Sequence, residues 1–503
     1  MVTTLALGAA RALSSICYEV TPSADLMTVE VKVTVPSQGQ AVDVTLPSWS
    51  PGYYVLENYS SNLKDVVAKA PDGSVRPVSH PRPDTWHIDP LGAQAVTVSY
   101  TRPVVHESGR MGIFSGDDVT VHYGGPSIYL YVEARKSEPC TVQFHVPKNL
   151  GLAVSLDPVG NGLFTAPNYD VLADSPVTIG TFRTAEYISR GKPHQLAVRG
   201  SARDRLDMAR AVKMTRFITE SETDFFGKSA PYNRYVWHIW AGDTPDGAGG
   251  LEHASSSQDF LSLAQGPASM RGLAHECFHL WNVKRIRSAS LGPFDYTRLP
   301  RTGALWWLEG VTDYYASLIP HRYGWYGDDQ YYKDIAANIR AVRSNPKRLE
   351  VSPYESSFRV GETNDGRGNS NGFGVDYYPT GWVTGMLLDI ELRARTGGKH
   401  NLDEIELALW DMCKDGKPGF DEGELRRQFV RVGGPEMGAV FDKWVMQPGD
   451  PPVELQLAKV GLSVGGTGRD LKVTESPTAT PEQKKLREGW FFGKRSRPSA
   501  LQG

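Results

Sequence analysis

Apolar and polar residues alternate along several short segments in the first 195 residues. The clearest segments are 26–35, 41–46, 95–100 and 128–132, and turns rich in Pro and Gly separate them. A period of two places every second side chain on the same face of a sheet, which is typical of half-buried strands. The pattern predicts an all-β, sandwich-like domain over residues 16–197.

The periodicity changes near residue 200. Apolar residues have helical spacing over 204–226, a strand is predicted at Tyr235–Trp240, and helical spacing dominates from 382 to about 445. A segment rich in Gly, Asn and Ser runs from 344 to 376 and is predicted to be a loop that closes over a site. The chain is therefore predicted to be α+β and multidomain, with a second domain at 198–345 and a mainly helical domain at 346–460.

The two ends of the sequence differ from this pattern. Residues 1–15 are mildly apolar, but they lack a basic start and Arg11 interrupts them. Both a signal-peptide remnant and a disordered lead remain open for this segment. Residues 461–503 are mostly polar, with Trp490–Phe492 as a lone apolar cluster, and we expect a partly disordered tail.

Composition narrows the class of protein. Apolar residues make up 40% of the 503 residues and charged residues 22%, as in a globular protein with a large core. The net charge is −3 and there is no basic stripe, so we expect no nucleic-acid partner. No run of 18 apolar residues is present, so we expect no membrane span. The oligomeric state stays unknown, and a bacterial periplasmic or secreted location and a cytoplasmic one both remain open.

Residues 275–279 have the sequence His-Glu-Cys-Phe-His. On a helix, residues four apart are separated by about 400° of rotation, so His275 and His279 leave the same face and can hold one metal ion. Glu276 lies beside that face, where it can take a proton from a metal-activated water. Cys277 points away from the shared face, so we do not expect a thiol ligand. The motif predicts a catalytic zinc helix.

A third ligand is expected downstream. Glu309 lies in the apolar, aromatic run Trp306–Tyr315, where a carboxylate is costly to bury unless it is paired or binds metal. Asp313 is four residues further on and is expected to accept the second N–H of a zinc histidine. The alternative is that Glu309 and Asp313 form an ordinary polar stripe on a helix. Two His and one Glu leave a fourth position for water, so one catalytic Zn²⁺ per chain is predicted.

These residues belong to longer patterns that resemble a known family. The segments 275–287, 293–296 and 305–310 look like the glycyl aminopeptidase family of zinc peptidases, whose catalytic domain is similar to thermolysin. A weaker resemblance extends from about residue 16 to 460, and Trp49–Tyr54 resembles a motif of the family's N-terminal domain. The resemblance implies that residues 198–345 form a thermolysin-like zinc catalytic domain and that the helical domain at 346–460 completes its cleft. Many relatives also carry a PDZ-like domain, but the residues after 461 are too few, so no complete PDZ domain is expected.

The resemblance also implies a substrate anchor. Gly249–His253 looks like the family's exopeptidase segment, which lies on an edge strand. By analogy Glu252, together with Gly250, would bind the free amino terminus of a substrate, and a carboxylate can hold an ammonium through charge-assisted hydrogen bonds. The alternative is that Glu252 is a surface residue of a strand.

A hydrogen-bond donor for the oxyanion is implied in the same way. Relatives have the pattern Tyr-x-Lys-Gly, and Tyr378 takes the tyrosine position of that pattern here. Thr380 stands where relatives often carry Lys, which makes the match looser. A phenol aimed at the developing negative charge would stabilise it. Tyr377 is the neighbouring competitor, and a tyrosine that merely packs in the core is the alternative.

The function predicted from the sequence is a zinc-dependent aminopeptidase. The resemblance implies removal of a small first residue, such as Gly or Ala, from peptides with a free N-terminus. A zinc endopeptidase or another zinc hydrolase on the same site is one alternative. A non-catalytic binding protein on this scaffold is another, although all of the chemical positions are intact.

Overall fold

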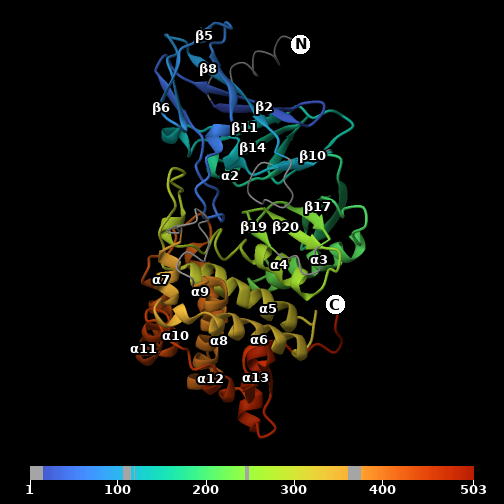
Figure 1. The fold of residues 1–503 in the computed structure, drawn as a ribbon, viewed down its shortest axis with the longest axis vertical. Helices are drawn as coiled ribbons and strands as arrows, with labels where there is room; N and C mark the ends of the chain where they lie inside the picture. The colour runs from blue at the N-terminus through green and yellow to red at the C-terminus, as the bar shows by residue number, and fades with distance from the viewer. Residues whose placement is uncertain (1–14, 106–114, 118, 244–248, 361–374) are drawn as a thin grey trace. The chain divides into compact units, whose positions relative to one another are not determined.

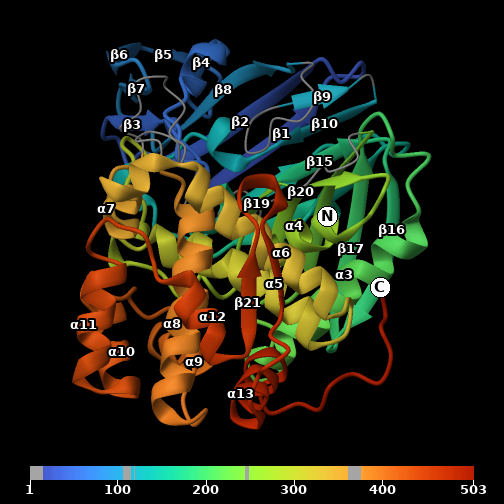
Figure 2. The same ribbon diagram turned by 60° about the horizontal axis from the view of Figure 1, so that its bottom comes forward.

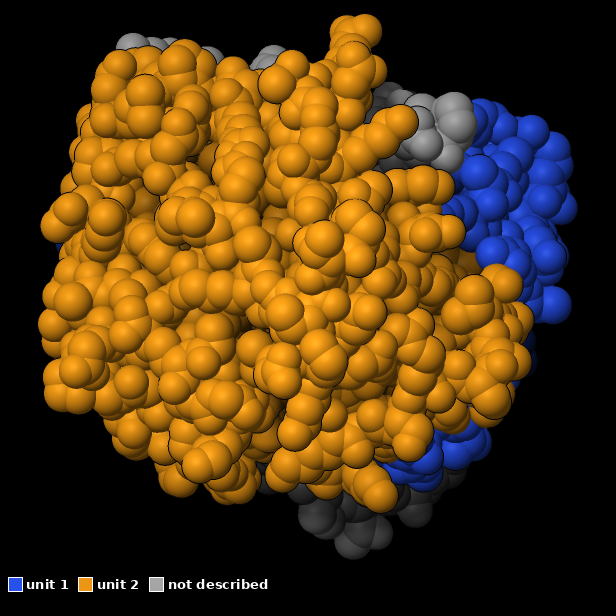
Figure 3. Space-filling model, turned by 90° about the horizontal axis from the view of Figure 1, so that it is seen from below, with its two compact units in different colours: residues 1–212, 232–269, 294–299 blue, residues 213–231, 270–293, 300–503 orange. Residues whose placement is uncertain are grey.

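The chain forms two compact units in the computed structural model, which describes residues 15–105, 115–117, 119–243, 249–360 and 375–503 (Figure 1). Unit 1 consists of residues 1–212, 232–269 and 294–299, and unit 2 of residues 213–231, 270–293 and 300–503 (Figure 3). Helix α3, Met208–Phe225, continues from the first unit into the second.

An eight-stranded sheet is the largest element of unit 1. Along β2 the residues Val29, Val31, Val33 and Val35 are buried and those between them are half-buried, as the alternating pattern predicts. Strand β1 runs parallel to β11, and the other pairs are antiparallel. The order is β13-β14-β11-β1-β2-β8-β4-β5, with bounds β1 Ile16–Pro22, β2 Thr28–Pro36, β4 Lys64–Lys69, β5 Val75–Arg76, β8 Ala95–Pro103, β11 Cys140–Phe144, β13 Asp157–Gly160 and β14 Leu163–Ala166.

Two smaller sheets and one short helix complete this β-rich region. The first sheet has the order β12-β15-β10-β9 and the second has the order β3-β7-β6. The bounds are β3 Val42–Thr45, β6 Val78–Arg82, β7 Thr85–Ile88, β9 Ser115–Asp117, β10 Thr120–Tyr123, β12 Gly151–Val154, β15 Val177–Gly180 and α2 Tyr169–Ala173.

The predicted strand at 128–132 is wrong. Residues 128–131 are all buried and form no ladder beyond one bridge between Tyr131 and Thr45. Tyrosine hydroxyls from Tyr18, Tyr100 and Tyr169 donate to the carbonyls that a neighbouring strand would otherwise engage. The aromatic and β-branched residues that suggested a strand therefore fill the core as an irregular segment.

A five-stranded sheet carries the segment that resembles an exopeptidase motif. Its order is β16-β17-β18-β20-β19, and the inner pairs β17–β18 and β18–β20 are parallel. Strand β19 lies at the edge and runs antiparallel to β20, as expected for the segment that contains Glu252. The bounds are β16 Arg183–Ser189, β17 Lys192–Arg199, β18 Tyr235–Gly242, β19 Gly250–Glu252 and β20 Ser256–Ser262.

Unit 2 is mainly helical. Helix α8, Tyr377–Thr396, is buried from Gly381 to Arg393 and packs against most of the other helices (Figure 2). The remaining bounds are α4 Pro267–Phe278, η5 Trp306–Val311, α5 Thr312–Arg322, α6 Asp328–Ser344, α7 Pro353–Phe358, α9 Leu402–Cys413, α10 Glu424–Gly433, α11 Pro435–Trp444 and α12 Val453–Lys459. The α+β class with an N-terminal β region and a later helical region is confirmed.

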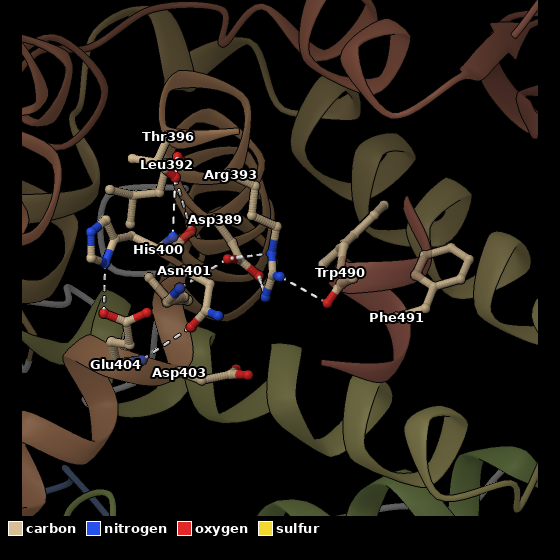
Figure 4. A network of polar contacts seen from close by, with 12 residues as sticks. Asp389, Leu392, Arg393, Thr396, His400, Asn401, Asp403, Glu404, Trp490 and Phe491 are labelled. Carbon is tan, nitrogen blue, oxygen red and sulfur yellow. Dashed lines mark hydrogen bonds and ion pairs between the residues drawn. The ribbon is translucent and has the colours of Figure 1, made fainter. Parts of the chain in front are cut away.

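A buried ion pair joins α8 to its neighbours. Asp389 and Arg393 face each other one helical turn apart, with Asp389 Oδ1 2.9 Å from Arg393 Nε (Figure 4). Tyr314 donates to the second oxygen of Asp389 at 2.8 Å, and the backbone N–H of Leu402 donates to the first at 2.9 Å. A buried charge pair is stable only when its remaining hydrogen-bonding positions are filled, as they are here.

The segment after residue 461 is more ordered than the sequence suggests. It contains β21 Leu462–Gly465, β22 Lys472–Glu475 and α13 Pro481–Phe492. Trp490 is fully buried and its indole N–H donates to Tyr314 at 2.7 Å, while Arg393 donates to the carbonyl of Gly489 at 2.8 Å. The three aromatic residues at 490–492 thus belong to the core of unit 2.

Other sequence-based expectations fall partly outside the described residues. Residues 1–14 lie outside them, and so do 361–374 of the loop predicted to close over the site. None of the described helices combines the length and apolar character needed to cross a membrane. The predicted domain boundaries remain a prediction.

Candidate metal and catalytic site

Three ligand atoms converge in unit 2. His275 Nε2 lies 2.9 Å from His279 Nε2, and Glu309 Oε2 lies 3.3 Å from His275 Nε2 and 3.2 Å from His279 Nε2. All three residues are buried. Ligand atoms near 2.0–2.2 Å from a tetrahedral ion lie about 3.3–3.6 Å apart, so the two separations from Glu309 match a small divalent cation such as zinc and the separation between the histidines is slightly shorter.

The end of one helix positions the two histidines. Helix α4 ends at Phe278, but the N–H of His279 still donates to the carbonyl of His275 at 3.3 Å. The i, i+4 relation therefore continues through the last turn, and the imidazole rings lie 4.4 Å apart and nearly perpendicular. The shared face expected from the spacing is present.

The third candidate ligand lies on a wider helical turn. Glu309 belongs to η5, which has π-helical geometry and continues directly into α5. Such turns occur mostly as single bulges within α-helices and are frequent at functional sites. The extra residue in the turn places Glu309 toward the histidines and leaves Asp313 on the first turn of α5.

The second nitrogen of each histidine has a different partner. His275 Nδ1 lies 2.8 Å from Asp313 Oδ1, the partner expected from the sequence. His279 Nδ1 lies 2.6 Å from the backbone carbonyl of Asn282. Because a carbonyl can only accept, His279 carries its proton on Nδ1, which leaves the lone pair of Nε2 directed at the site.

Asn282 links two segments of the candidate site, a contact that the sequence did not reveal. Its side-chain amide donates to the carbonyl of Trp307 at 3.2 Å and to the hydroxyl of Thr312 at 3.0 Å. Asn282 thereby joins the segment after the zinc-motif helix to the helical turn that carries Glu309. The only sequence signal was its place three residues after His279, within the segment 275–287.

The site is electrostatically coupled. Burial alone would lower the pKa of His275, but the Asp313 carboxylate, with support from Glu309 and Glu276, raises it well above the usual range. Burial alone would raise the pKa of Glu309, but the two histidines lower it to about 2. A negative carboxylate between two imidazoles is suited to holding a cation.

A close helix contact places Tyr378. A methyl group added at Gly310 would lie 2.5 Å from Gly381 Cα, so only glycine permits η5 and α8 to approach this closely. The ring of Tyr378, on the first turn of α8, lies 5.8 Å from that of His275. Tyr377 is 2% exposed and buried in the core, whereas Tyr378 is half-buried. The geometry therefore favours Tyr378 over Tyr377 as a residue of the site.

Of the remaining predicted site residues, Glu276 and Glu252 are buried and Gly250 is half-buried. Glu276, next to His275 on α4, is 5% exposed. Glu252 and Gly250 lie on β19 in unit 1, where Glu252 is 4% exposed. The buried thiol of Cys277 adjoins Glu222 of α3, whose carboxyl has a strongly raised pKa because of burial.

Arg285 lies shortly after the zinc motif, and the sequence indicated no role for it. Its side chain binds backbone carbonyl groups. Its guanidinium donates to the carbonyls of Leu280 at 2.7 Å and Pro231 at 2.6 Å. These bonds hold the segment that follows α4, which is a structural role.

Comparison with known families identifies the chain. Residues 18–181 match the Peptidase M61 N-terminal domain, and residues 269–384 match the M61 glycyl aminopeptidase. The chain belongs to the M61 glycyl aminopeptidase family. The resemblance inferred from the sequence is thus confirmed, and this member of the M61 family is a metallopeptidase. The converging His275, His279 and Glu309 lie within the matched region, so the zinc-peptidase character of the site is confirmed at that level.

Solved structures share this fold. An aminopeptidase N family protein from Idiomarina loihiensis is similar with a TM-score of 0.81 and 24% identity, over 90% of this chain and 79% of that one. The M1 zinc metallopeptidase from Deinococcus radiodurans, solved as a variant, has a TM-score of 0.53 and 14% identity, over 87% and 95%. That protein was also solved bound to a Tyr-Ser-Ala substrate. A search of curated proteins gave no match.

Proposed function

We propose that this M61 family member is a zinc-dependent aminopeptidase that removes a small first residue, Gly or Ala, from peptides. The observation that carries the proposal is the convergence of His275 Nε2, His279 Nε2 and Glu309 Oε2 in one buried site. Family membership supports the peptide substrate and the preference for a free N-terminus. The proposed domain division is 16–197, 198–345 and 346–460.

The proposed ligands are His275, His279 and Glu309, with one zinc ion per chain. When bound, zinc would lower the pKa of a water molecule and polarise the scissile carbonyl. Asp313 orients the ring of His275 so that Nε2 faces the site, and the carbonyl of Asn282 does the same for His279. These partners fix the donor set before the metal arrives, which favours metal binding.

Glu276 is the proposed general base. It follows His275 directly on α4, so its carboxylate lies beside the ligand face and not on it. A carboxylate oxygen of Glu276 takes a proton from the attacking water and then delivers it to the leaving amine, so the carboxylate is regenerated. Tyr378 is the proposed donor whose phenol hydrogen-bonds to the oxyanion of the tetrahedral intermediate.

Glu252 is the proposed anchor for the substrate. Its carboxylate would accept hydrogen bonds from the ammonium of the first residue, and Gly250 on the same short strand would leave room for that residue. An ammonium held at one fixed place limits cleavage to the first peptide bond. Peptides with a blocked N-terminus would lose this interaction.

The general-base role is tested with Glu276→Gln. Gln keeps the size of the side chain but cannot accept the proton, so kcat on Ala-p-nitroanilide should fall by at least about 10²-fold. The zinc content, measured by metal analysis, should stay at one per chain because Glu276 is not a ligand. Full activity in a zinc-loaded Glu276→Gln enzyme would disprove the role.

A further inference from the structure

A turn in the N-terminal β region lies directly against the proposed anchor. Gly52 is in the left-handed region, with φ of +90°. A methyl group added at Gly52 would lie 2.5 and 2.6 Å from the two carboxylate oxygens of Glu252 and 2.7 Å from Leu251 Cδ1. These separations are far below ordinary carbon–oxygen contact distances. The backbone of Gly52 therefore lies so close to the Glu252 carboxylate that any side chain at position 52 would clash with it.

The turn is held firmly. The N–H of Tyr53 donates to the carbonyl of Ser50 at 2.9 Å, and the Ser50 hydroxyl bonds to Tyr59 at 3.0 Å. Just before it, the indole of Trp49, 1% exposed, donates to the carbonyl of Asp295 at 2.9 Å. These hydrogen bonds, all within unit 1, hold the turn in place, so it cannot easily move away from the Glu252 carboxylate.

The strand that carries Glu252 is held equally firmly. Glu252 pairs with Ser257 in the ladder between β19 and β20. In the next two residues, His253 Nδ1 lies 3.0 Å from Asp174 Oδ1, and the N–H of Ala254 donates to Asp174 Oδ2 at 2.7 Å. A side chain added at position 52 would therefore displace the Glu252 carboxylate, because the backbone on both sides is fixed.

We propose that Gly52 is a positioning residue of the substrate amino-terminus site. The absence of a side chain at position 52 lets the Glu252 carboxylate lie against the turn, in the orientation that binds the ammonium of a peptide substrate. This inference rests on the proposed anchor role of Glu252. It gives the turn Ser50–Tyr53 a part in substrate recognition, beyond a purely structural one.

The test is Gly52→Ala, with Gly73→Ala as a matched control. Gly73 has φ of +85° in the same unit, and an added methyl there meets nothing within 4 Å, so the control carries the same backbone strain without the clash. Gly52→Ala should raise KM for Ala-p-nitroanilide about 10-fold or more, the loss expected for one charge-assisted hydrogen bond. Its kcat and zinc affinity should change little, and Gly73→Ala should match the wild type.

A double-mutant cycle with Glu252→Asp separates the clash from general damage. Asp is one methylene shorter, so its oxygens withdraw from residue 52. The KM increase caused by Gly52→Ala should therefore shrink to about 2-fold or less in the Glu252→Asp background. An increase of the same size in both backgrounds would overturn the inference.

The outcomes also distinguish this inference from the proposed function. If Glu252→Gln left KM unchanged in an active enzyme, the anchor role would be wrong and the inference would fall with it. If Glu252→Gln raised KM and Gly52→Ala did not, only the inference would be wrong. If Gly52→Ala did not fold, Tyr59→Phe would loosen the turn by removing the bond to Ser50 and should raise KM about 2- to 5-fold. An unchanged KM in that variant would overturn the inference.

Discussion

At the scale of single residues, the two candidate zinc histidines depend on different kinds of partner. His275 is held by the Asp313 carboxylate, a side chain that substitution can remove. His279 is held by the backbone carbonyl of Asn282. A substitution at position 282 keeps this carbonyl, and its direction depends on the backbone conformation. Removing Asp313 therefore tests the positioning of the ligands more directly than a substitution at 282.

Asp313→Ala should weaken zinc binding by about 10- to 100-fold, because His275 loses the partner that fixes its tautomer and ring orientation. Competition with a chelating dye would measure the dissociation constant. Asp329→Ala, which removes a carboxylate from the first turn of α6, serves as the control and should bind zinc as the wild type does. Equal affinity in both variants would mean that Asp313 does not position His275.

Glu406 provides a pH-dependent prediction. It is fully buried on α9, and burial raises its pKa to about 8, only partly offset by the nearby indole N–H of Trp307. The folded state therefore keeps a proton that the unfolded state releases above the ordinary glutamate pKa of 4.5. Stability contributed by this proton is present at acid pH and is lost progressively as pH rises from 4.5 toward 8.

Glu406→Gln should remove that loss, because Gln stays neutral throughout. The variant should gain thermal stability relative to the wild type on going from pH 5 to pH 8, by an amount on the order of a few kcal/mol. Melting temperatures at several pH values would measure the difference, with exposed Glu350→Gln as the control. A constant difference between Glu406→Gln and wild type at all pH values would contradict the account.

Residues within a local motif were predictable, and residues that act through a distant partner were not. His275, Glu276 and His279 share one helical turn, and Glu309 stood out as a carboxylate in an apolar run. Gly52 and Glu252 are 200 positions apart, and nothing local marks their contact. Sequence periodicity reports burial and facing direction, so it cannot supply such pairs.

At the scale of elements, glycines explain how η5 and α8 meet. Gly310 and Gly381 both occur in the sequence patterns that contain Glu309 and Tyr378, and their missing side chains let the two elements touch at the backbone. The helices themselves were predictable from apolar spacing, as in 386–392 of α8. Their closeness became evident only from the structure.

The C-terminal helix α13 is predicted to be part of the folding unit. Trp490→Ala would empty a buried site and remove the bond to Tyr314, a change that costs about 3–5 kcal/mol. The melting temperature should fall by several degrees, whereas Leu455→Ala, at a side chain 70% exposed, should leave it nearly unchanged. A melting temperature for Trp490→Ala within about a degree of wild type would contradict the packing described for α13.

Two of the elements that the sequence misjudged share a cause. The segment 128–132 has strand composition, and the segment after 461 has tail composition, but long-range contacts decide both. Tyrosine hydroxyls from other elements take the carbonyls of the first. Arg393 and Tyr314 bind α13 in the second. Local propensity gives way where partners far along the chain satisfy the backbone.

At the scale of the whole molecule, the two compact units are discontinuous in sequence. Unit 2 combines 213–231 and 270–293 with the long segment 300–503, so the zinc-motif helix and the Glu309 segment meet in one unit although 294–299 belongs to the other. The order of strands followed by helices was predictable from periodicity. The interleaving was not, because it depends on which segments pack together.

Hydrolysis of Gly- and Ala-p-nitroanilide, compared with their N-acetylated forms with and without a chelator, decides whether this protein is a zinc aminopeptidase. We expect that only the free-amine forms are cleaved, that a chelator abolishes the cleavage, and that added zinc restores it. Equal cleavage of the acetylated forms would contradict the aminopeptidase assignment and favour an endopeptidase or a broader hydrolase. Cleavage that survives complete removal of zinc would contradict the metal site itself.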